Sequence, residues 1–337
     1  MRMSEPVIVC RDLWKIYGAH PDRMVGQSAE AIRAAGHVAA VRDVSLDIAK
    51  GEMLVIMGLS GSGKSTLVRC LSRLVESTSG SVHIDGQDLL ALSEKELIDI
   101  RRNKMGMVFQ NFGLLPHRTV LENVAFPLEM RGQSKHDRRD RALEVIKLVG
   151  LEGREDYFPR ELSGGQQQRV GIARSLAIEP DIWFLDEPFS ALDPLIRREM
   201  QDEFLRLQEL LGKTIVFITH DFDEALRLAD RIAIMYEGAV EQCDTPDRIV
   251  MNPATEYVAK FTREIAKARV VHARALTVPG NGAGGEPVPE TATIASLGRR
   301  LIEDTGEIAV VDTEGAPLGV LDRNAALALL FEDEAAS

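Results

Sequence analysis

Cysteine and aromatic residues are scarce in this sequence, and each shortage excludes a class of protein. The three cysteines, Cys10, Cys70 and Cys243, are scattered and form no Cys-x-x-Cys pair. We therefore expect neither a disulfide framework nor a thiolate metal site, and a reduced, cytosolic compartment in which each thiol is a small packed or surface side chain. Aromatic residues make up 5% of the chain, which argues against a dense face that stacks on nucleic-acid bases.

Positive charge and long apolar runs are also lacking. The 337 residues carry a formal net charge of −12, opposite to the balance usual in proteins that bind a polyphosphate backbone, so we expect no nucleic-acid partner. The segment Met1–Arg11 holds no apolar region of signal-peptide length. The apolar run Met53–Leu59 is far shorter than the roughly 20 residues of a membrane helix. We expect a chain that reaches a membrane only through a partner.

Strand-like and helix-like segments alternate along most of the chain. Met53–Met57 is a continuous apolar run, typical of a strand buried on both faces. Val7–Leu13 alternates loosely and predicts an edge strand, whereas Val41–Ile48 alternates well. Further strands are expected at 81–84, 104–110, 182–185, 214–218 and 231–236, and helices at 64–74, 194–211 and 221–229. This order predicts an α/β fold with a largely parallel sheet and an antiparallel β layer beside it.

Two stretches depart from this alternation. Residues 19–40 look like an insertion, in which Ser28 caps a short Ala-rich helix that ends at Gly36. Between about 111 and 176 the pattern is mostly helical, which predicts a helical subdomain.

The C-terminal part predicts a small separate module. We place a main domain at 1–264, a linker rich in Pro and Gly at 265–292, and an α/β module at 293–337. The module is expected to contain a helix, two strands joined by a turn at Gly315, and a final helix.

A glycine-rich loop follows the predicted buried strand and opens a helix. It fits the pattern G-x-x-x-x-G-K-[ST], and its residues are Gly58, Leu59, Ser60, Gly61, Ser62, Gly63, Lys64, Ser65 and Thr66. Glycines let backbone N–H groups turn inward around a polyphosphate, and the helix N-terminus adds a positive dipole. The loop therefore predicts a nucleoside triphosphate site, in which Lys64 reaches the β- and γ-phosphates and the Ser65 hydroxyl binds Mg²⁺.

Two acidic residues follow the apolar run Ile182–Leu185. A buried strand carries Asp186 to its C-terminal end, where ligands bind in open α/β sheets. We predict that Asp186 orients Mg²⁺, through a water, and that Glu187 polarises an attacking water.

The sequence also contains a set of short motifs in a characteristic order. The string Leu162-Ser163-Gly164-Gly165-Gln166 resembles the signature of the ATP-binding cassette (ABC) family. Four further residues match that family's pattern in order: Tyr17 the aromatic that stacks on adenine, Gln110 the Q-loop glutamine, Asp193 the D-loop aspartate and His220 the switch histidine. The resemblance covers about residues 7–260.

This resemblance implies a head-to-tail pair of cassettes with two ATP molecules in the interface. Ser163, Gly164, Gly165 and Gln166 stand at the start of a predicted helix, which is a second anion site. The chain has one phosphate loop, so the signature of a second copy would complete the site. In that arrangement His220 contacts the γ-phosphate, and Gln110 contacts Mg²⁺ and the attacking water.

Three strings, Lys15–Gly18, Met57–Lys64 and Ser190–Arg197, together look like the bacterial glycine betaine/proline (quaternary amine) importers. That resemblance implies a membrane permease, an extracytoplasmic binding protein, and a peripheral position on the cytoplasmic face of the inner membrane. Residues 111–117 are the expected contact with the permease. Thr293–Leu330 resembles a single cystathionine-β-synthase-type (CBS) regulatory repeat, where osmoregulated relatives can carry two.

Three alternatives remain open. One is an importer for another small solute, such as an amino acid or a polyamine. Another is a cassette ATPase of translation or DNA repair, although the single cassette, the lack of a long coiled-coil insertion and the acidic charge argue against it. The third is a non-enzymatic regulatory module, which the presence of Lys64, Asp186, Glu187 and His220 disfavours.

Overall fold

The computed structural model describes residues 5–109, 113–263, 265–280, 282, 286–304 and 306–335. The chain divides into two compact units, Met1–Val240 and Glu241–Ser337. The division falls earlier than the boundary expected after residue 264, because α9 (Pro246–Met251), which contacts α10 (Glu256–Thr262), packs against α11 (Lys267–Val270) of the second unit. Among the described residues, no helix combines the length and apolarity that a membrane span needs.

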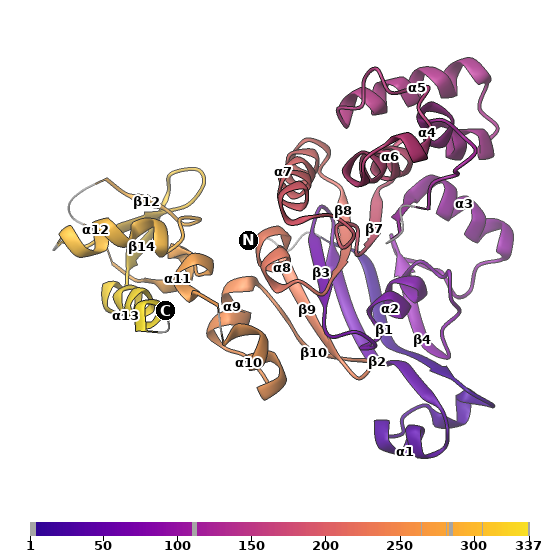
Figure 1. Ribbon diagram of the computed structural model, residues 1–337. Helices are drawn as coiled ribbons and strands as arrows, with labels where there is room; N and C mark the ends of the chain where they lie inside the picture. The colour runs from indigo at the N-terminus through magenta and orange to yellow at the C-terminus, as the bar shows by residue number, and fades with distance from the viewer. Residues whose placement is uncertain are drawn as a thin grey trace. The chain divides into compact units, whose positions relative to one another are not determined.

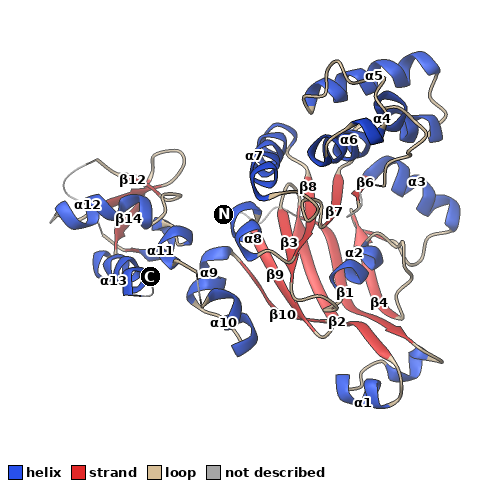
Figure 2. Cartoon of the chain, in the orientation of Figure 1, coloured by secondary structure: helices blue, strands red, loops and turns tan. Residues whose placement is uncertain are grey.

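Five strands of a six-stranded sheet lie in the first unit (Figure 2), and the sixth, β10, begins there and continues past Val240. Its order is β10 (Ala239–Asp244), β9 (Arg231–Tyr236), β3 (Met53–Met57), β8 (Thr214–Thr219), β7 (Ile182–Asp186) and β6 (Met105–Val108). The strands from β9 to β6 are parallel, and every residue of β3, β7 and β8 is buried. The predicted parallel sheet is thus confirmed, and its strands end along one edge.

A second, antiparallel sheet lies in the same unit. Its order is β2 (Val38–Ala49), β1 (Pro6–Tyr17), β4 (Ser79–Ile84) and β5 (Gln87–Asp88). The expectation that the first strand is an edge strand was wrong, since β1 pairs with β2 on one side and β4 on the other. Alternating burial along a strand reveals which face is exposed and carries no information about the number of neighbouring strands.

Eight helices are described in the first unit: α1 (Ala29–Ala34), α2 (Lys64–Leu71), α3 (Glu94–Lys104), α4 (Val120–Met130), α5 (Lys135–Leu148), α6 (Gly164–Leu176), α7 (Pro194–Leu211) and α8 (Phe222–Leu228). Helices α4, α5 and α6 pack against one another, and the short 3-10 helix Pro159–Glu161 precedes α6 (Figure 1). Capping boxes fix the starts of α3 and α4, at Ser93 and Thr119. Helix α2 contacts strands of both sheets.

The expected insertion folds as a short excursion between β1 and β2. It contains the 3-10 helix Pro21–Met24 and α1, and the Ser28 hydroxyl accepts the N–H of Ala31 at 3.2 Å, as expected for the cap. Ile32 is the buried residue of α1 and packs with Trp14 and Ile16 of β1. The insertion ends earlier than expected, because β2 already begins at Val38.

The second unit has a four-stranded sheet in the order β11 (Thr277–Val278), β14 (Pro317–Leu321), β13 (Ala309–Val311) and β12 (Val288–Pro289). Besides α9, α10 and α11, its helices are the 3-10 segments Ala273–Leu276 and Ala295–Leu297, α12 (Gly298–Glu303) and α13 (Arg323–Ala335). The expected order of helix, strand, turn at Gly315, strand and helix is present in α12, β13, β14 and α13.

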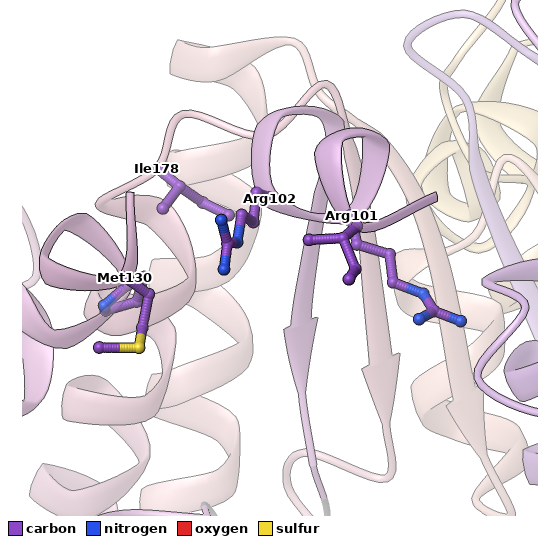
Figure 3. A pocket seen from close by; sticks show the side chains of 6 residues that line it. Arg101, Arg102, Met130 and Ile178 are labelled. Atoms are coloured by element: carbon purple, nitrogen blue, oxygen red, sulfur yellow. The ribbon is translucent and has the colours of Figure 1, made fainter. Parts of the chain in front are cut away.

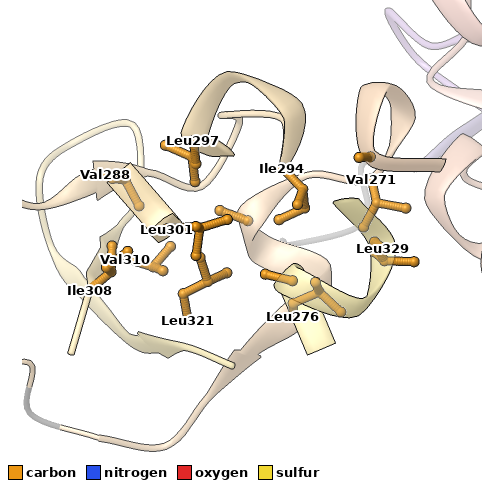
Figure 4. Close-up of a cluster of buried hydrophobic side chains, with 13 residues drawn as sticks. Val271, Leu276, Val288, Ile294, Leu297, Leu301, Ile308, Val310, Leu321 and Leu329 are labelled. Carbon is orange, nitrogen blue, oxygen red and sulfur yellow. The ribbon is translucent and has the colours of Figure 1, made fainter. Parts of the chain in front are cut away.

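The hydrophobic core of the second unit includes residues expected in the linker (Figure 4). The core side chains contributed by residues 265–292 are Ala268, Val271, Ala273, Leu276 and Val288. Residues 267–278 therefore do not form a flexible linker, because their apolar side chains pack against α12, α13 and the sheet. The neighbouring Pro- and Gly-rich stretch dominated the composition and obscured this apolar segment.

Candidate functional site

The phosphate loop connects the buried strand β3 to α2, at the edge where the parallel strands end. Nζ of Lys64 donates hydrogen bonds to the carbonyl oxygens of Gly58, at 2.8 Å, and Leu59, at 3.1 Å. The Lys64 side chain is buried, and burial lowers its pKa, while the nearby Glu187 and Asp186 act in the opposite direction. Ser60 and Gly61 are exposed at the tip, and Ser65 and Thr66 lie in the first turn of α2.

Gly58 and Gly63 of this loop are required for two reasons: their backbone has positive φ, and neighbouring main chain leaves no room for a side chain. A Cβ atom on Gly58, whose φ is 149°, would lie 2.3 Å from the carbonyl oxygen of Met235. A Cβ atom on Gly63, whose φ is 102°, would lie 1.9 Å from the carbonyl oxygen of Ala40. The phosphate loop is therefore in backbone contact with β9 on one side and β2 on the other.

Ser65 and Asp186 meet between α2 and the end of β7. The Ser65 hydroxyl donates a hydrogen bond of 2.9 Å to Oδ1 of Asp186, and a guanidinium nitrogen of Arg69 lies 3.8 Å from Oδ2. Burial raises the pKa of Asp186, and the hydrogen bond from Ser65 opposes that rise. Among the described residues, no cluster of three or more His, Cys, Asp or Glu side chains forms a protein-only metal cage. One hydroxyl and one carboxylate beside a phosphate loop are instead the donor set suited to Mg²⁺, which binds through few protein oxygens plus phosphates and waters.

Glu187 and His220 meet across the ends of the neighbouring strands β7 and β8. Nδ1 of His220 lies 3.2 Å from Oε2 of Glu187. Glu187 has a φ of 46°, in the left-handed region, and its N–H donates to the carbonyl oxygen of Ile218 at 3.1 Å. The hydroxyl of Ser190 donates to the Glu187 carbonyl oxygen at 2.9 Å. A non-glycine residue held in this conformation stores strain that the surrounding bonds must maintain.

A buried polar network supports the segment that follows His220. Asp221 caps α8 and forms an ion pair of 3.2 Å with Arg197 of α7. The buried Glu224 accepts a hydrogen bond of 2.8 Å from the side-chain amide of Gln201, whose oxygen accepts one of 3.1 Å from Arg227. Burial raises the pKa of Glu224. Sequence reasoning missed these residues, and the one available signal was a run of polar residues on the inner side of two amphipathic helices.

The signature residues form the N-terminus of α6. Ser163 is the cap, and its N–H donates to the side-chain oxygen of Gln166 at 3.0 Å, which completes a capping box. Ser163 and Gly164 are exposed, whereas Gly165 is buried. The first turn of α6 thus presents backbone N–H groups at an exposed helix start, as an anion site requires. Asp193 caps α7 by accepting the N–H of Ile196 at 3.1 Å.

Two predicted site residues remain. Tyr17 lies at the end of β1, and Gln110 lies outside the described residues. Tyr17 is the last residue of β1, its side chain is 46% exposed, and Nζ of Lys15 lies 4.9 Å from the centre of its ring. Gln110 lies outside the described residues, as do the first two residues of the expected permease contact at 111–117.

Gln168, in the middle of α6, was not singled out from the sequence. It is fully buried, and among the described residues neither the oxygen nor the nitrogen of its amide has a hydrogen-bond partner. A buried, unsatisfied amide is costly.

The chain is similar to known ATP-binding proteins over most of its length. A family model described as "ABC transporter" matches residues 41–190. The "Trimethylamine N-oxide transport system ATP-binding protein" of Ruegeria pomeroyi is 71% identical over 335 residues, which cover 98% of each chain. The "Glycine betaine/proline betaine transport system ATP-binding protein" of Escherichia coli is 53% identical over 270 residues, 78% of this chain and 68% of that one. A solved ATP-binding cassette, described as dimeric and bound to ADP and Pi, is 38% identical with a TM-score of 0.61, covering 71% of this chain and 98% of its own.

Proposed function

The chain belongs to the ABC transporter family, as the ATP-hydrolysing subunit of a transport system, and we propose that it powers uptake of a small solute with a fully substituted nitrogen through a separate permease. The observation that carries the proposal is the 71% identity, over 98% of both chains, to the relative named for trimethylamine N-oxide. Relatives named for glycine betaine are also similar, over about three quarters of this chain. Trimethylamine N-oxide and glycine betaine both join a trimethylated nitrogen to a negative oxygen group, so one class of permease fits both.

The proposed hydrolytic site combines the phosphate loop with the acids and the histidine at the strand ends. Lys64 and the N–H groups of the loop hold the β- and γ-phosphates. When ATP binds, the 2.8 Å hydrogen bond from Nζ of Lys64 to the Gly58 carbonyl oxygen is replaced by a bond to phosphate. Glu187 polarises the attacking water. His220 lies within hydrogen-bond distance of Glu187, orients the Glu187 carboxylate and faces the γ-phosphate. Tyr17 is the proposed platform for the adenine ring.

Ser65 and Asp186 are the proposed holders of Mg²⁺, with Gln110 as a further ligand from outside the described residues. The ion, when bound, neutralises charge that develops between the β- and γ-phosphate oxygens.

A second copy of the chain is the proposed partner for hydrolysis. The exposed first turn of α6, from Ser163 to Gln166, would bind the phosphates held by the other copy's loop. The dimeric cassette among the solved relatives supports this arrangement.

The proposed permease surface is an apolar pocket between α3 and α4 (Figure 3). Its volume is about 250 Å³, and its lining residues are Ile98, Arg101, Arg102, Pro127, Met130 and Ile178. Ile98 and Met130 are large apolar side chains that remain exposed there. With this partner the chain would sit peripherally on the cytoplasmic face of the membrane, and an extracytoplasmic binding protein would deliver the solute.

ATP hydrolysis by the chain reconstituted with its permease and binding protein tests the proposal. Trimethylamine N-oxide, glycine betaine, choline, an amino acid and a polyamine would be added in turn, with Glu187→Gln as the inactive control. We expect stimulation by trimethylamine N-oxide or a betaine and none in the control. Stimulation by the amino acid or the polyamine alone would replace the solute class and leave the ATPase assignment standing.

A further inference from the structure

The excursion between β1 and β2 is much longer than the connection between these strands requires. The strands are antiparallel neighbours, with Tyr17 opposite Val38, and the connection comprises every residue from Gly18 to His37. Antiparallel neighbours need only about two to five residues in the turn, and connections longer than about 15 residues in a compact domain usually have a function. The contacts of this excursion indicate what that function is.

At one end, the excursion is fastened beside the proposed base platform. The two ring nitrogens of His37 lie 2.6 Å from the carbonyl oxygen of Ala19 and 2.9 Å from that of Ala35. The ring also packs directly on Gly18, where a Cβ atom would lie 2.1 Å from the imidazole. His37 therefore holds the backbone that follows Tyr17 in place.

At the other end, the strand that leaves the excursion lies against the phosphate loop. The carbonyl oxygen of Ala40 occupies the space where Gly63 lacks a side chain. Two residues along, the N–H of Arg42 donates to the carbonyl oxygen of Gly238 at 2.7 Å, and the N–H of Gly238 donates to that of Ser62 at 3.0 Å. The β9–β10 turn is thus bonded to both β2 and the phosphate loop.

The helix of the excursion joins the same turn directly. Arg33 of α1 forms an ion pair of 2.9 Å with Glu237, the residue before Gly238. Glu237 has a φ of 44°, so the turn holds a non-glycine residue in the left-handed region. Burial of Ile32 against Trp14 and Ile16 anchors α1 to β1 while Arg33 reaches the turn.

We propose that the excursion 18–37 is a positioning element that fixes the base platform relative to the phosphate loop, with His37 and Arg33 as its positioning residues. The proposal rests on the proposed function, because it takes Tyr17 as the adenine platform. A nucleoside triphosphate must contact the platform and the loop at once. If these parts move independently, binding must supply the free energy of ordering them, and affinity for the whole nucleotide falls. The excursion sets affinity for ATP and leaves the hydrolytic step unchanged.

The test compares ATP with inorganic tripolyphosphate, which engages the phosphate loop and has no base. ATP hydrolysis is measured in the assembled transporter, with tripolyphosphate as competitive inhibitor. For His37→Ala, loss of the ring packed on Gly18 and of its N–H hydrogen bonding to the Ala19 and Ala35 carbonyl oxygens predicts an ATP KM about fivefold higher, with kcat and the tripolyphosphate inhibition constant unchanged. His37→Gln, whose side-chain NH2 group can donate to these carbonyl oxygens, should restore most of the affinity.

The Arg33–Glu237 ion pair gives a second, independent test with a matched control. Arg33→Glu should raise the ATP KM about threefold, as expected for an exposed pair, and the double variant Arg33→Glu with Glu237→Lys should restore it. Lys147→Glu on α5, which breaks a comparably exposed ion pair with Glu152, should leave the ATP KM unchanged. This arm carries the test if His37→Ala does not fold.

Tyr17→Ala separates this proposal from the proposed function. An unchanged ATP KM in the excursion variants, together with a raised KM in Tyr17→Ala, overturns the positioning role and keeps the platform. An unchanged KM in Tyr17→Ala overturns both. A fall in kcat, or an equal loss of tripolyphosphate affinity, would show that the excursion only maintains the fold of the loop.

Discussion

The Ser65 hydroxyl donates a 2.9 Å hydrogen bond to Oδ1 of Asp186, and this bond joins the helix that follows the phosphate loop to the end of the neighbouring strand β7. The two residues are 121 positions apart in the sequence, with the whole helical segment between them, and the fold of the parallel sheet and α2 brings them together. The proposed ion site therefore depends on strand order, since β8 alone separates β7 from β3, the strand that leads into the loop.

Replacing Glu187 by Gln should abolish turnover without loss of ATP binding. The amide keeps the size of the side chain but cannot polarise a water as a carboxylate does, so kcat should fall at least about 100-fold. His220→Ala should give a similar loss, because His220 is the residue bonded to Glu187. Steady-state hydrolysis and equilibrium binding of ATP check this pair. A Glu187→Gln enzyme with more than a tenth of normal kcat would contradict the assignment of the base.

Gly63→Ala should unfold the chain at a markedly lower temperature than Gly61→Ala. Both residues have positive φ, but the added methyl group at Gly63 meets the Ala40 carbonyl, whereas the one at Gly61 enters open space. We expect about 1 kcal/mol of destabilisation for Gly61→Ala and more than about 3 kcal/mol for Gly63→Ala. Denaturant unfolding without nucleotide measures both, and equal losses would show that strain in φ alone governs the loop.

Gln168→Leu should stabilise the protein. The buried amide has no hydrogen-bond partner within the part of the chain that the structure describes, so an apolar side chain of similar size removes an unsatisfied group and should add about 1 kcal/mol. Gln201→Leu is the matched control, since its amide is bonded to Glu224 and Arg227, and it should destabilise. Thermal unfolding compares the two. A loss of stability in Gln168→Leu would mean that the amide is satisfied in solution.

Stability of the second unit should fall as pH rises above 6.5, through a His272–Asp247 pair. Nδ1 of His272 lies 3.1 Å from Oδ1 of Asp247, and this hydrogen bond raises the His272 pKa above its ordinary value of 6.5. Because the folded-state pKa is the higher one, the contribution is complete below pH 6.5 and disappears as pH rises through the folded-state pKa.

Asp247 titrates far below this window. Burial raises its pKa, but the hydrogen bonds from His272 outweigh burial, and the net pKa is lowered. In unfolding scans between about pH 5.5 and 8.5, His272→Gln should therefore remove the dependence, a shift of about 1–3 °C for a partly exposed pair. An unchanged pH profile in that variant would assign the dependence to another group.

Removal of the second unit tests its proposed regulatory role. A deletion should begin after Asp244, the last residue of β10, because a cut at residue 277 would leave the core residues Val271 and Leu276 without their partners. The truncated chain should keep solute-stimulated ATP hydrolysis and lose its dependence on salt or nucleotide. Retention of the full dependence would contradict the regulatory role.

Features encoded by neighbouring residues could be predicted from the sequence. The phosphate loop, the acids after β7 and the Ser28 cap each depend on a few consecutive residues whose physical roles are local. The extents of β3, α7 and β9 could also be predicted from their apolar periodicity, and the structure has the same bounds.

Features that depend on which segments become neighbours could not be predicted. The second partner of β1, the Gln201–Glu224 bond and the contact of Ala40 with Gly63 join residues far apart in the chain. Periodicity indicates that such residues face inward and does not reveal what they will face.

The left-handed backbone at Glu187 has a consequence for anyone selecting heat-resistant forms of this chain. A glycine there would relieve about 1 kcal/mol of strain, so a screen that rewards thermal resistance alone should enrich Gly at position 187 and yield sturdier proteins that no longer turn over ATP. Libraries built for thermostability should therefore keep this codon fixed.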